Sequence, residues 1–225
     1  IMKHLYKLFT VLLLLSTSAS FSQCIDVDWI NPSPQGNDHS GMQVVSDDTV
    51  YLVGRGRTFM KTYDGGVTWT RTIIPDIEPV DVSFVTPQLG YVSGFNGNYG
   101  KVYKTTDGGT SWAEMLTTPG PQQTFYQVQF VNADTGFAAG YPGSLVYKTT
   151  DGGNTWVSKN TGASGANTWI YAMQFVTPQK GFAMIANEQI AMTTDGGDTW
   201  TKQNLLAGMT ITSMHFGDSL NGYIL

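Results

Sequence analysis

Cysteine is nearly absent, since Cys24 is the single one among 225 residues. No intramolecular disulfide can therefore form, and hydrophobic packing has to stabilise the fold. Arginine is also scarce: the chain has three, all between positions 55 and 71, and its formal net charge is -5. A chain without clustered positive charge lacks the means to neutralise a phosphate backbone, which excludes nucleic acid as a partner.

Long apolar runs are missing too, except for the segment from Leu8 to Leu15. That run is too short to span a membrane. Lys3 and Lys7 precede it and small residues follow it, which is the layout of a secretory signal peptide. We expect residues 1-22 to form this signal and the mature chain to have no transmembrane segment. The protein would then be periplasmic, cell-surface or secreted.

Both ends of the sequence are unusual. Ile1 precedes a plausible start at Met2, and the chain stops at "NGYIL" within a repeated pattern. We expect a fragment of a longer protein, with 23-225 as one partial domain.

What the chain has in abundance is a repeat. "MKTYDGGVTW", "YKTTDGGTSW", "YKTTDGGNTW" and "AMTTDGGDTW" place aspartates at positions 64, 107, 151 and 195, spaced 43, 44 and 44 residues apart. A unique catalytic site does not occur in four copies. A period of this length is typical of the four-stranded blade of a β-propeller.

One unit divides into four strands, named A to D from the inside outwards. Residues 80-85 alternate as strand A, 91-95 form strand B, 101-106 form strand C, and "TSWAEM" forms strand D after an Asp-Gly-Gly turn. No segment after the signal peptide keeps a helical period. The fold class is therefore all-β, with blades at about 42-72, 80-116, 126-159 and 170-203 and a partial blade at 210-225.

The repeated turn resembles the Asp-box, or BNR repeat, whose form is Ser/Thr-x-Asp-x-Gly-x-Thr/Ser-Trp. The "FV(T/N)xxxG(Y/F)" element ahead of each box is most similar to the photosystem II assembly factor family and its secreted bacterial relatives. The resemblance implies a β-propeller, of seven blades in the complete protein, and turn-forming rather than catalytic boxes. The box residues are Asp64, Gly66, Trp69, Asp107, Gly109, Trp112, Asp151, Gly153, Trp156, Asp195, Gly197 and Trp200.

A propeller also needs its ring closed. Residues 23-35, with Trp29 ahead of turn residues, are predicted to supply the outermost strand of the last blade. The fragment would then be an open arc of four blades and part of a fifth.

Alternating strand directions place the A-B turns and the boxes on one face, here called the box face. The B-C and D-A loops emerge on the opposite face, here called the loop face. Sequence variety is concentrated there, and aromatic rings with Asn and Gly suit protein or glycan recognition, although rings at these positions can also simply pack between blades. The candidate binding residues are Arg55, Arg57, Phe95, Asn96, Tyr99, Tyr126, Tyr141, Trp169, Tyr171 and Glu188.

The main hypothesis is an exported, non-catalytic propeller that binds a protein or a glycan as an assembly factor or surface scaffold. The acidic composition differs from the arginine-rich surface of the assembly factor family. The alternative is a glycoside hydrolase of the xyloglucanase type, which needs two convergent carboxylates on the loop face. The carboxylates available there are Asp38, Asp76, Glu78 and Glu188.

Other chemistry is not predicted. The consecutive residues Asp38, His39 and Ser40 cannot face one another as a catalytic triad. A sialidase needs an arginine cluster, which the chain lacks. Each box brings a single carboxylate, whereas calcium takes about six to eight oxygens. We therefore expect no catalytic residue, no metal and no cofactor.

Overall fold

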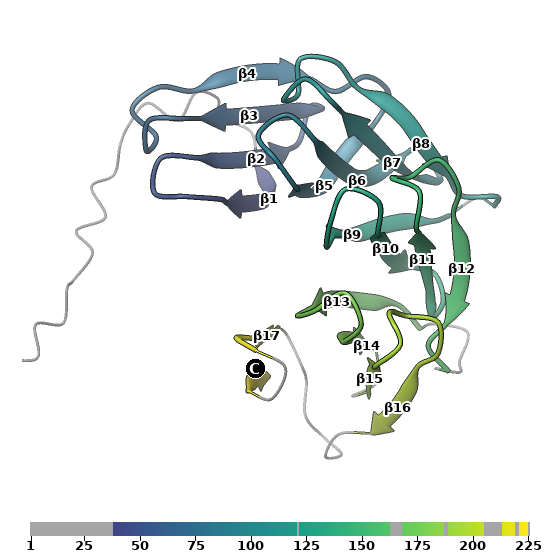
Figure 1. Cartoon of the computed structure of the whole chain (residues 1–225). Helices are drawn as coiled ribbons and strands as arrows, with labels where there is room; N and C mark the ends of the chain where they lie inside the picture. Colours follow the sequence, from purple (N-terminus) through teal and green to yellow (C-terminus); the bar gives the residue numbers. More distant parts are fainter. Residues whose placement is uncertain are drawn as a thin grey trace, which may run out of the picture. The chain divides into compact units, whose positions relative to one another are not determined.

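A computed structural model describes residues 38-120, 122-162, 168-186, 189-204, 213-218 and 221-224. Contacts divide the chain into two units, Ile1–Asn31 and Pro32–Leu225, and every described residue belongs to the second. The predicted signal peptide at 1-22 and closing strand at 23-35 therefore lie outside the described residues. Within the described part there are eighteen strands and no helix, which confirms the all-β prediction (Figure 1).

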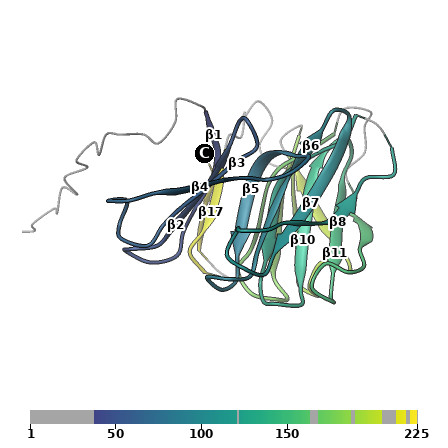
Figure 2. The same cartoon turned by 90° about the horizontal axis from the view of Figure 1, so that it is seen from above.

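In the described residues, four four-stranded antiparallel sheets and one two-stranded sheet follow one another in chain order. In each, consecutive strands are hydrogen-bonded neighbours, and Figure 2 shows β6 and β7 of the second sheet side by side. This is the propeller-blade arrangement that the repeat predicts.

The first sheet comprises β1 (His39–Val44), β2 (Val50–Gly54), β3 (Thr58–Thr62) and β4 (Thr70–Ile73). The second comprises β5 (Glu78–Phe84), β6 (Gly90–Asn96), β7 (Tyr99–Thr105) and β8 (Ala113–Thr117). The third comprises β9 (Thr124–Phe130), β10 (Gly136–Tyr141), β11 (Leu145–Thr149) and β12 (Val157–Asn160). The fourth comprises β13 (Ile170–Phe175), β14 (Gly181–Ile185), β15 (Gln189–Thr193) and β16 (Thr201–Asn204), and the last β17 (Met214–Phe216) and β18 (Gly222–Ile224).

The outermost strands begin later than the sequence predicts. Strand D of the second blade was expected from Thr110, whereas β8 begins at Ala113, after the box tryptophan. The reason is that the Asp107 carboxylate holds the intervening residues in the turn: the backbone N–H groups of Thr110 and Ser111 donate to its Oδ1 at 3.0 and 2.9 Å.

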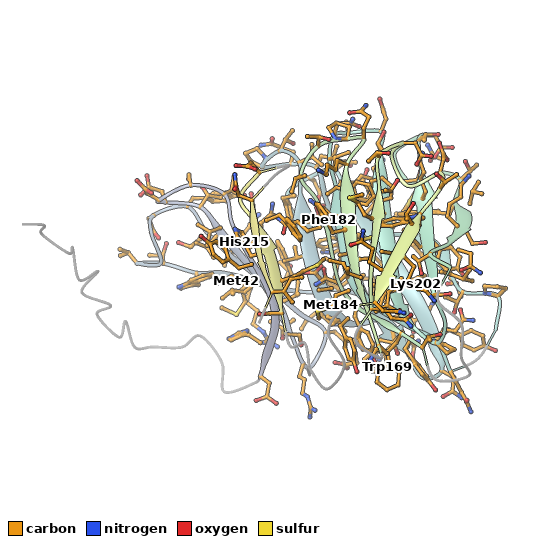
Figure 3. All side chains as sticks on the ribbon, turned by 90° about the horizontal axis from the view of Figure 1, so that it is seen from below. Met42, Trp169, Phe182, Met184, Lys202 and His215 are labelled. Carbon is orange, nitrogen blue, oxygen red and sulfur yellow. The ribbon has the colours of Figure 1, made fainter. Side chains whose placement is uncertain are left out.

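Aromatic rings join successive blades in a repeated way. From the second blade onwards, each innermost strand ends in a Phe. The ring of this Phe stacks on the aromatic ring of the second residue of strand B in the preceding blade. Centroid distances are 3.4 to 3.8 Å. The stacked pairs are Tyr51–Phe84, Tyr91–Phe130, Phe137–Phe175 and Phe182–Phe216, and Figure 3 labels Phe182.

Each of these Phe residues lies opposite a glycine in its own sheet. Phe130 pairs with Gly136, and a Cβ built on that glycine would lie 2.5 Å from the Phe130 ring. The same pairing recurs as Phe84 with Gly90, Phe175 with Gly181, and Phe216 with Gly222. In the first blade, where the Phe is replaced by Val44, the opposite residue is Val50. The glycine is therefore required by the ring that covers it.

Amide side chains add polar contacts between blades. The Gln129 side chain accepts a hydrogen bond from the Phe175 N–H at 2.7 Å and donates to the Phe175 carbonyl at 2.9 Å. Gln43 and Gln174 make the same two contacts with Phe84 and Phe216. At the remaining described boundary Ser83 takes this position and accepts from the Phe130 N–H at 3.0 Å. These hydrogen bonds fix the position of each innermost strand relative to the innermost strand of the next blade.

The Asp-box aspartates are turn formers in all four blades. In the second, the Ser111 hydroxyl donates to Asp107 Oδ2 at 2.6 Å, and the Thr105 hydroxyl donates to Oδ1 at 2.8 Å. The Thr105 oxygen in turn accepts from the N–H of Gly109, whose φ of +84° favours glycine. Donors on every side stabilise the ionised carboxylate, so the pKa of Asp107 falls to about 2, chiefly through the Ser111 hydroxyl.

We expect these boxes to make the stability of the fold depend on pH in the acid range. The pKa values of Asp64 and Asp151 are likewise lowered to about 2 by hydroxyl donors, and that of Asp195 is lowered in the same direction. A carboxylate whose pKa is lower in the folded than in the unfolded protein stabilises the fold at pH values above its unfolded-state pKa. This contribution is lost as the pH falls through the folded-state pKa. We expect the urea midpoint of unfolding to fall steeply between about pH 4 and pH 2. Asp107→Asn should flatten this dependence, whereas substitution of the exposed Asp47 by Asn should leave it unchanged. Equal pH profiles for both variants would contradict this interpretation.

Candidate functional site

Four of the aromatic residues predicted for the loop face converge on one pocket. Tyr126 lies in β9, Tyr141 ends β10, Trp169 directly precedes β13, and Tyr171 lies in β13. Together with Val80 of β5 they line a cavity of about 540 Å³, here called the aromatic pocket. Trp169 is labelled in Figure 3. The pocket thus takes residues from the second, third and fourth blades.

The rings of the aromatic pocket stand at steep angles to one another. The Trp169 ring lies 5.6 Å from that of Tyr141, with an interplanar angle of 66°, and 5.3 Å from that of Tyr171, with an angle of 88°. Tyr126 and Tyr171 remain 36% and 45% exposed, so their rings are accessible at the mouth. Burial raises the pKa of the Tyr126 hydroxyl, and the neighbouring Tyr141 and Tyr171 add to the effect. The Tyr126 phenol is therefore neutral at physiological pH.

A second, more polar cavity adjoins the first through their shared residue Val80. It has a volume of about 490 Å³, and we call it the polar pocket. Arg55 and Phe95, both predicted for the loop face, line it together with Glu78. The Glu78 carboxylate accepts a hydrogen bond from the Gly56 N–H at 3.1 Å, and Arg55 Nε lies 3.6 Å from Asp38 Oδ2.

Asn96 belongs to a third, separate cluster. Its side-chain amide donates to Asp76 Oδ1, and Lys101 bridges Asp76 and Glu114 at N–O distances of 2.9 and 2.6 Å. Hydrogen bonding to Glu114, opposed by burial and reinforced by Asp76, raises the pKa of Lys101. Because Lys101 is buried, this network anchors the loop between the first and second blades.

The remaining predicted residues do not join the aromatic pocket. Arg57 is exposed in a turn at a positive φ of 59°, and Tyr99 is 43% exposed. Glu188 lies outside the described residues. In contrast, sequence reasoning missed Val80, because an aliphatic residue in a strand gives no functional signal.

Across the described ranges no three His, Cys, Asp or Glu side chains gather closely enough to hold a metal ion. Asp76 is occupied by Lys101 and Asn96, and Glu78 by a backbone N–H. No helix in the described part of the chain is long and apolar enough to cross a membrane.

Comparison with known proteins agrees with this architecture. The family model described as "Photosynthesis system II assembly factor YCF48" matches residues 73-166. The "Photosystem II assembly lipoprotein Ycf48" of Synechocystis sp. is 29% identical over 105 residues, which cover 44% of this chain and 30% of that protein. The chain is thus a BNR-type β-propeller related to the photosystem II assembly factor.

Solved structures show the same fold. "YCF48 bound to D1 peptide" superposes with a TM-score of 0.63 at 21% identity, covering 81% of this chain and 58% of that one. YCF48 from Cyanidioschyzon merolae gives 0.64 at 20% identity, covering 82% and 62%. The GH74 xyloglucanase from Xanthomonas campestris gives 0.60 at 14% identity, covering 84% and 34%. The chain therefore spans less than two thirds of the length of each of these similar proteins.

Proposed function

We propose that this chain is an exported, non-catalytic β-propeller that binds a protein or glycan partner through its loop face, as an assembly factor or cell-surface scaffold. The observation that carries the proposal is the aromatic pocket, in which the third and fourth blades contribute four rings to one accessible cavity. Tyr and Trp supply large contact areas and lose little conformational entropy on binding. The similarity to an assembly lipoprotein, and to the structure of YCF48 bound to D1 peptide, supports a binding role and an exported location.

The carboxylates of the loop face favour binding over hydrolysis. A glycosidase needs one carboxyl group to donate a proton and a second to act as base or nucleophile. Asp76 and Glu78 instead stabilise loops, through Lys101 and the Gly56 N–H respectively. The likeness to a GH74 xyloglucanase keeps hydrolysis as the second candidate function, with Asp38 and Glu188 as its further carboxylates.

Site-specific crosslinking tests the binding proposal. A photoreactive p-benzoylphenylalanine in place of Tyr171 samples the loop face, and the same residue in place of Tyr63, which is 50% exposed beside the first Asp-box, samples the box face. We expect ultraviolet irradiation in the native extracellular milieu to give discrete adducts from the Tyr171 position only. Adducts from the Tyr63 position alone would place the partner on the box face and contradict the proposal.

A glycan array tests whether the partner is a glycan or a protein. A hydrolysis assay tests whether the chain is an enzyme. We expect wild-type protein to release no reducing sugar from xyloglucan or other β-glucans. The non-catalytic proposal would be overturned if the wild-type protein hydrolysed a glucan and either Asp76→Asn or Glu78→Gln abolished this activity. The control variant Asp47→Asn should then keep the activity.

A further inference from the structure

We propose that the aromatic pocket binds an ammonium group carrying apolar substituents, such as a quaternary ammonium. This inference rests on the proposed function, because it uses the same loop face and specifies the chemistry that the face recognises. It depends on three properties of the pocket: the angles between its rings, its charge, and its shortage of polar groups.

The angles between the rings favour a compact ligand group over a flat one. The Trp169 ring contacts Tyr141 and Tyr171 at interplanar angles of 66° and 88°, so it meets both neighbours at a steep angle. A platform for stacking a sugar ring needs an open flat surface, whereas walls that meet at steep angles contact a rounded group from several sides. The face of every aromatic ring carries negative electrostatic potential, which attracts a cation placed over it.

The charge around the aromatic pocket also favours a cation. Among the residues that the structure describes, its lining consists of Val80, Tyr126, Tyr141, Trp169 and Tyr171, none of which is cationic. Arg55, in the polar pocket on the other side of Val80, is paired with Asp38. The whole chain has a formal net charge of -5, so its long-range field attracts cations as well.

The shortage of polar groups argues against a glycan as the occupant of this particular cavity. Sugars need several hydrogen-bonding partners, and the described lining residues offer only three phenol hydroxyls and one indole N–H. That indole nitrogen, Trp169 Nε1, is buried and has no hydrogen-bond partner among the described residues. A cavity of about 540 Å³ is larger than a trimethylammonium group, which leaves room for the chain that carries it.

The test compares two ligands of the same shape that differ in charge. Choline and 3,3-dimethylbutan-1-ol have nearly identical volumes, but the neutral alcohol has carbon in place of the quaternary nitrogen. We expect isothermal titration to give a choline dissociation constant on the order of 1 mM, and binding of the neutral alcohol about tenfold weaker. Equal affinities would show a merely apolar pocket and overturn the inference, and so would the absence of saturable choline binding.

Variants locate the binding. Trp169→Ala and Tyr171→Ala should each weaken choline binding about tenfold, while Tyr171→Phe, which keeps the ring, should stay within about twofold of wild type. Tyr63→Ala is the matched control, because Tyr63 is an exposed aromatic residue on the box face, outside the pocket lining. Tyr171 is 45% exposed, so its substitution tests the inference even if Trp169→Ala does not fold. Unchanged choline binding in Tyr171→Ala would overturn the inference.

The two proposals fail in distinguishable ways. If choline does not bind but the Tyr171 position still crosslinks to a partner, the proposed function stands and the ammonium inference is wrong. If choline binds but no crosslink forms from the loop face, the ammonium site stands and the partner-binding proposal is wrong.

Discussion

Phe130→Ala is expected to lower the free energy of unfolding by about 3 to 5 kcal/mol. The Phe130 ring is 7% exposed and stacks on Tyr91 of the preceding blade with a centroid distance of 3.4 Å and an interplanar angle of 4°. The edge-to-face contact with Trp156 at 6.0 Å covers it from its own blade. Truncation therefore opens a cavity between two blades that neither ring can fill. Urea denaturation followed by tryptophan fluorescence measures the loss.

Tyr99→Ala provides the control for this variant. Tyr99 is also aromatic, but it is 43% exposed on the loop face, so its removal should change stability by less than about 0.5 kcal/mol. A loss below about 1 kcal/mol for Phe130→Ala would mean that the stacked rings do not hold the blades together.

The repeat in the sequence was sufficient to predict the blades but not the contacts between them. Spacing of the Asp-boxes and period-two alternation predicted four four-stranded sheets and Asp-Gly-Gly hairpins, because these depend on residues close together in the chain. The stacking of Tyr91 on Phe130 was not predictable in this way, since it joins two different blades. The same limit explains why the role of Gly136 is visible only in the structure, where the Phe130 ring lies over it.

The candidate site was predictable in part for a related reason. Assigning loops to one face brought Tyr126, Tyr141, Trp169 and Tyr171 into the same set, and the structure gathers them around one cavity. Strand alternation could not distinguish them from Tyr99, which occupies the same face but lies outside the pocket lining. The distinction depends on how far each blade is rotated against the next, and that rotation is set by the interblade contacts of rings and glutamines.

Gly136→Val is expected to destabilise the protein by about 1 to 3 kcal/mol through overpacking. Gly136 pairs directly with Phe130, and a Cβ at this position would lie 2.5 Å from atoms of the ring. The ring cannot move aside freely, because Tyr91 and Trp156 contact it. The added side chain must therefore displace Phe130 from its stack, which thermal and urea unfolding would register. Gly120→Ala is the control, because a Cβ there has its nearest neighbour at 3.6 Å.

A double variant tests whether ring and glycine act as a pair. In the first blade the equivalent positions are Val44 and Val50, which face each other across the strands. Phe130→Val combined with Gly136→Val copies that arrangement into the third blade, and the new valine occupies space that the ring has left. The single variants for comparison are Phe130→Val and Gly136→Val. We expect the stability loss of the double variant to be at least about 1 kcal/mol smaller than the sum of their two losses, which is the coupling typical of residues in contact. Strictly additive losses would show that the glycine is not needed to accommodate the ring, and that the recurring Phe–Gly pairs have another cause.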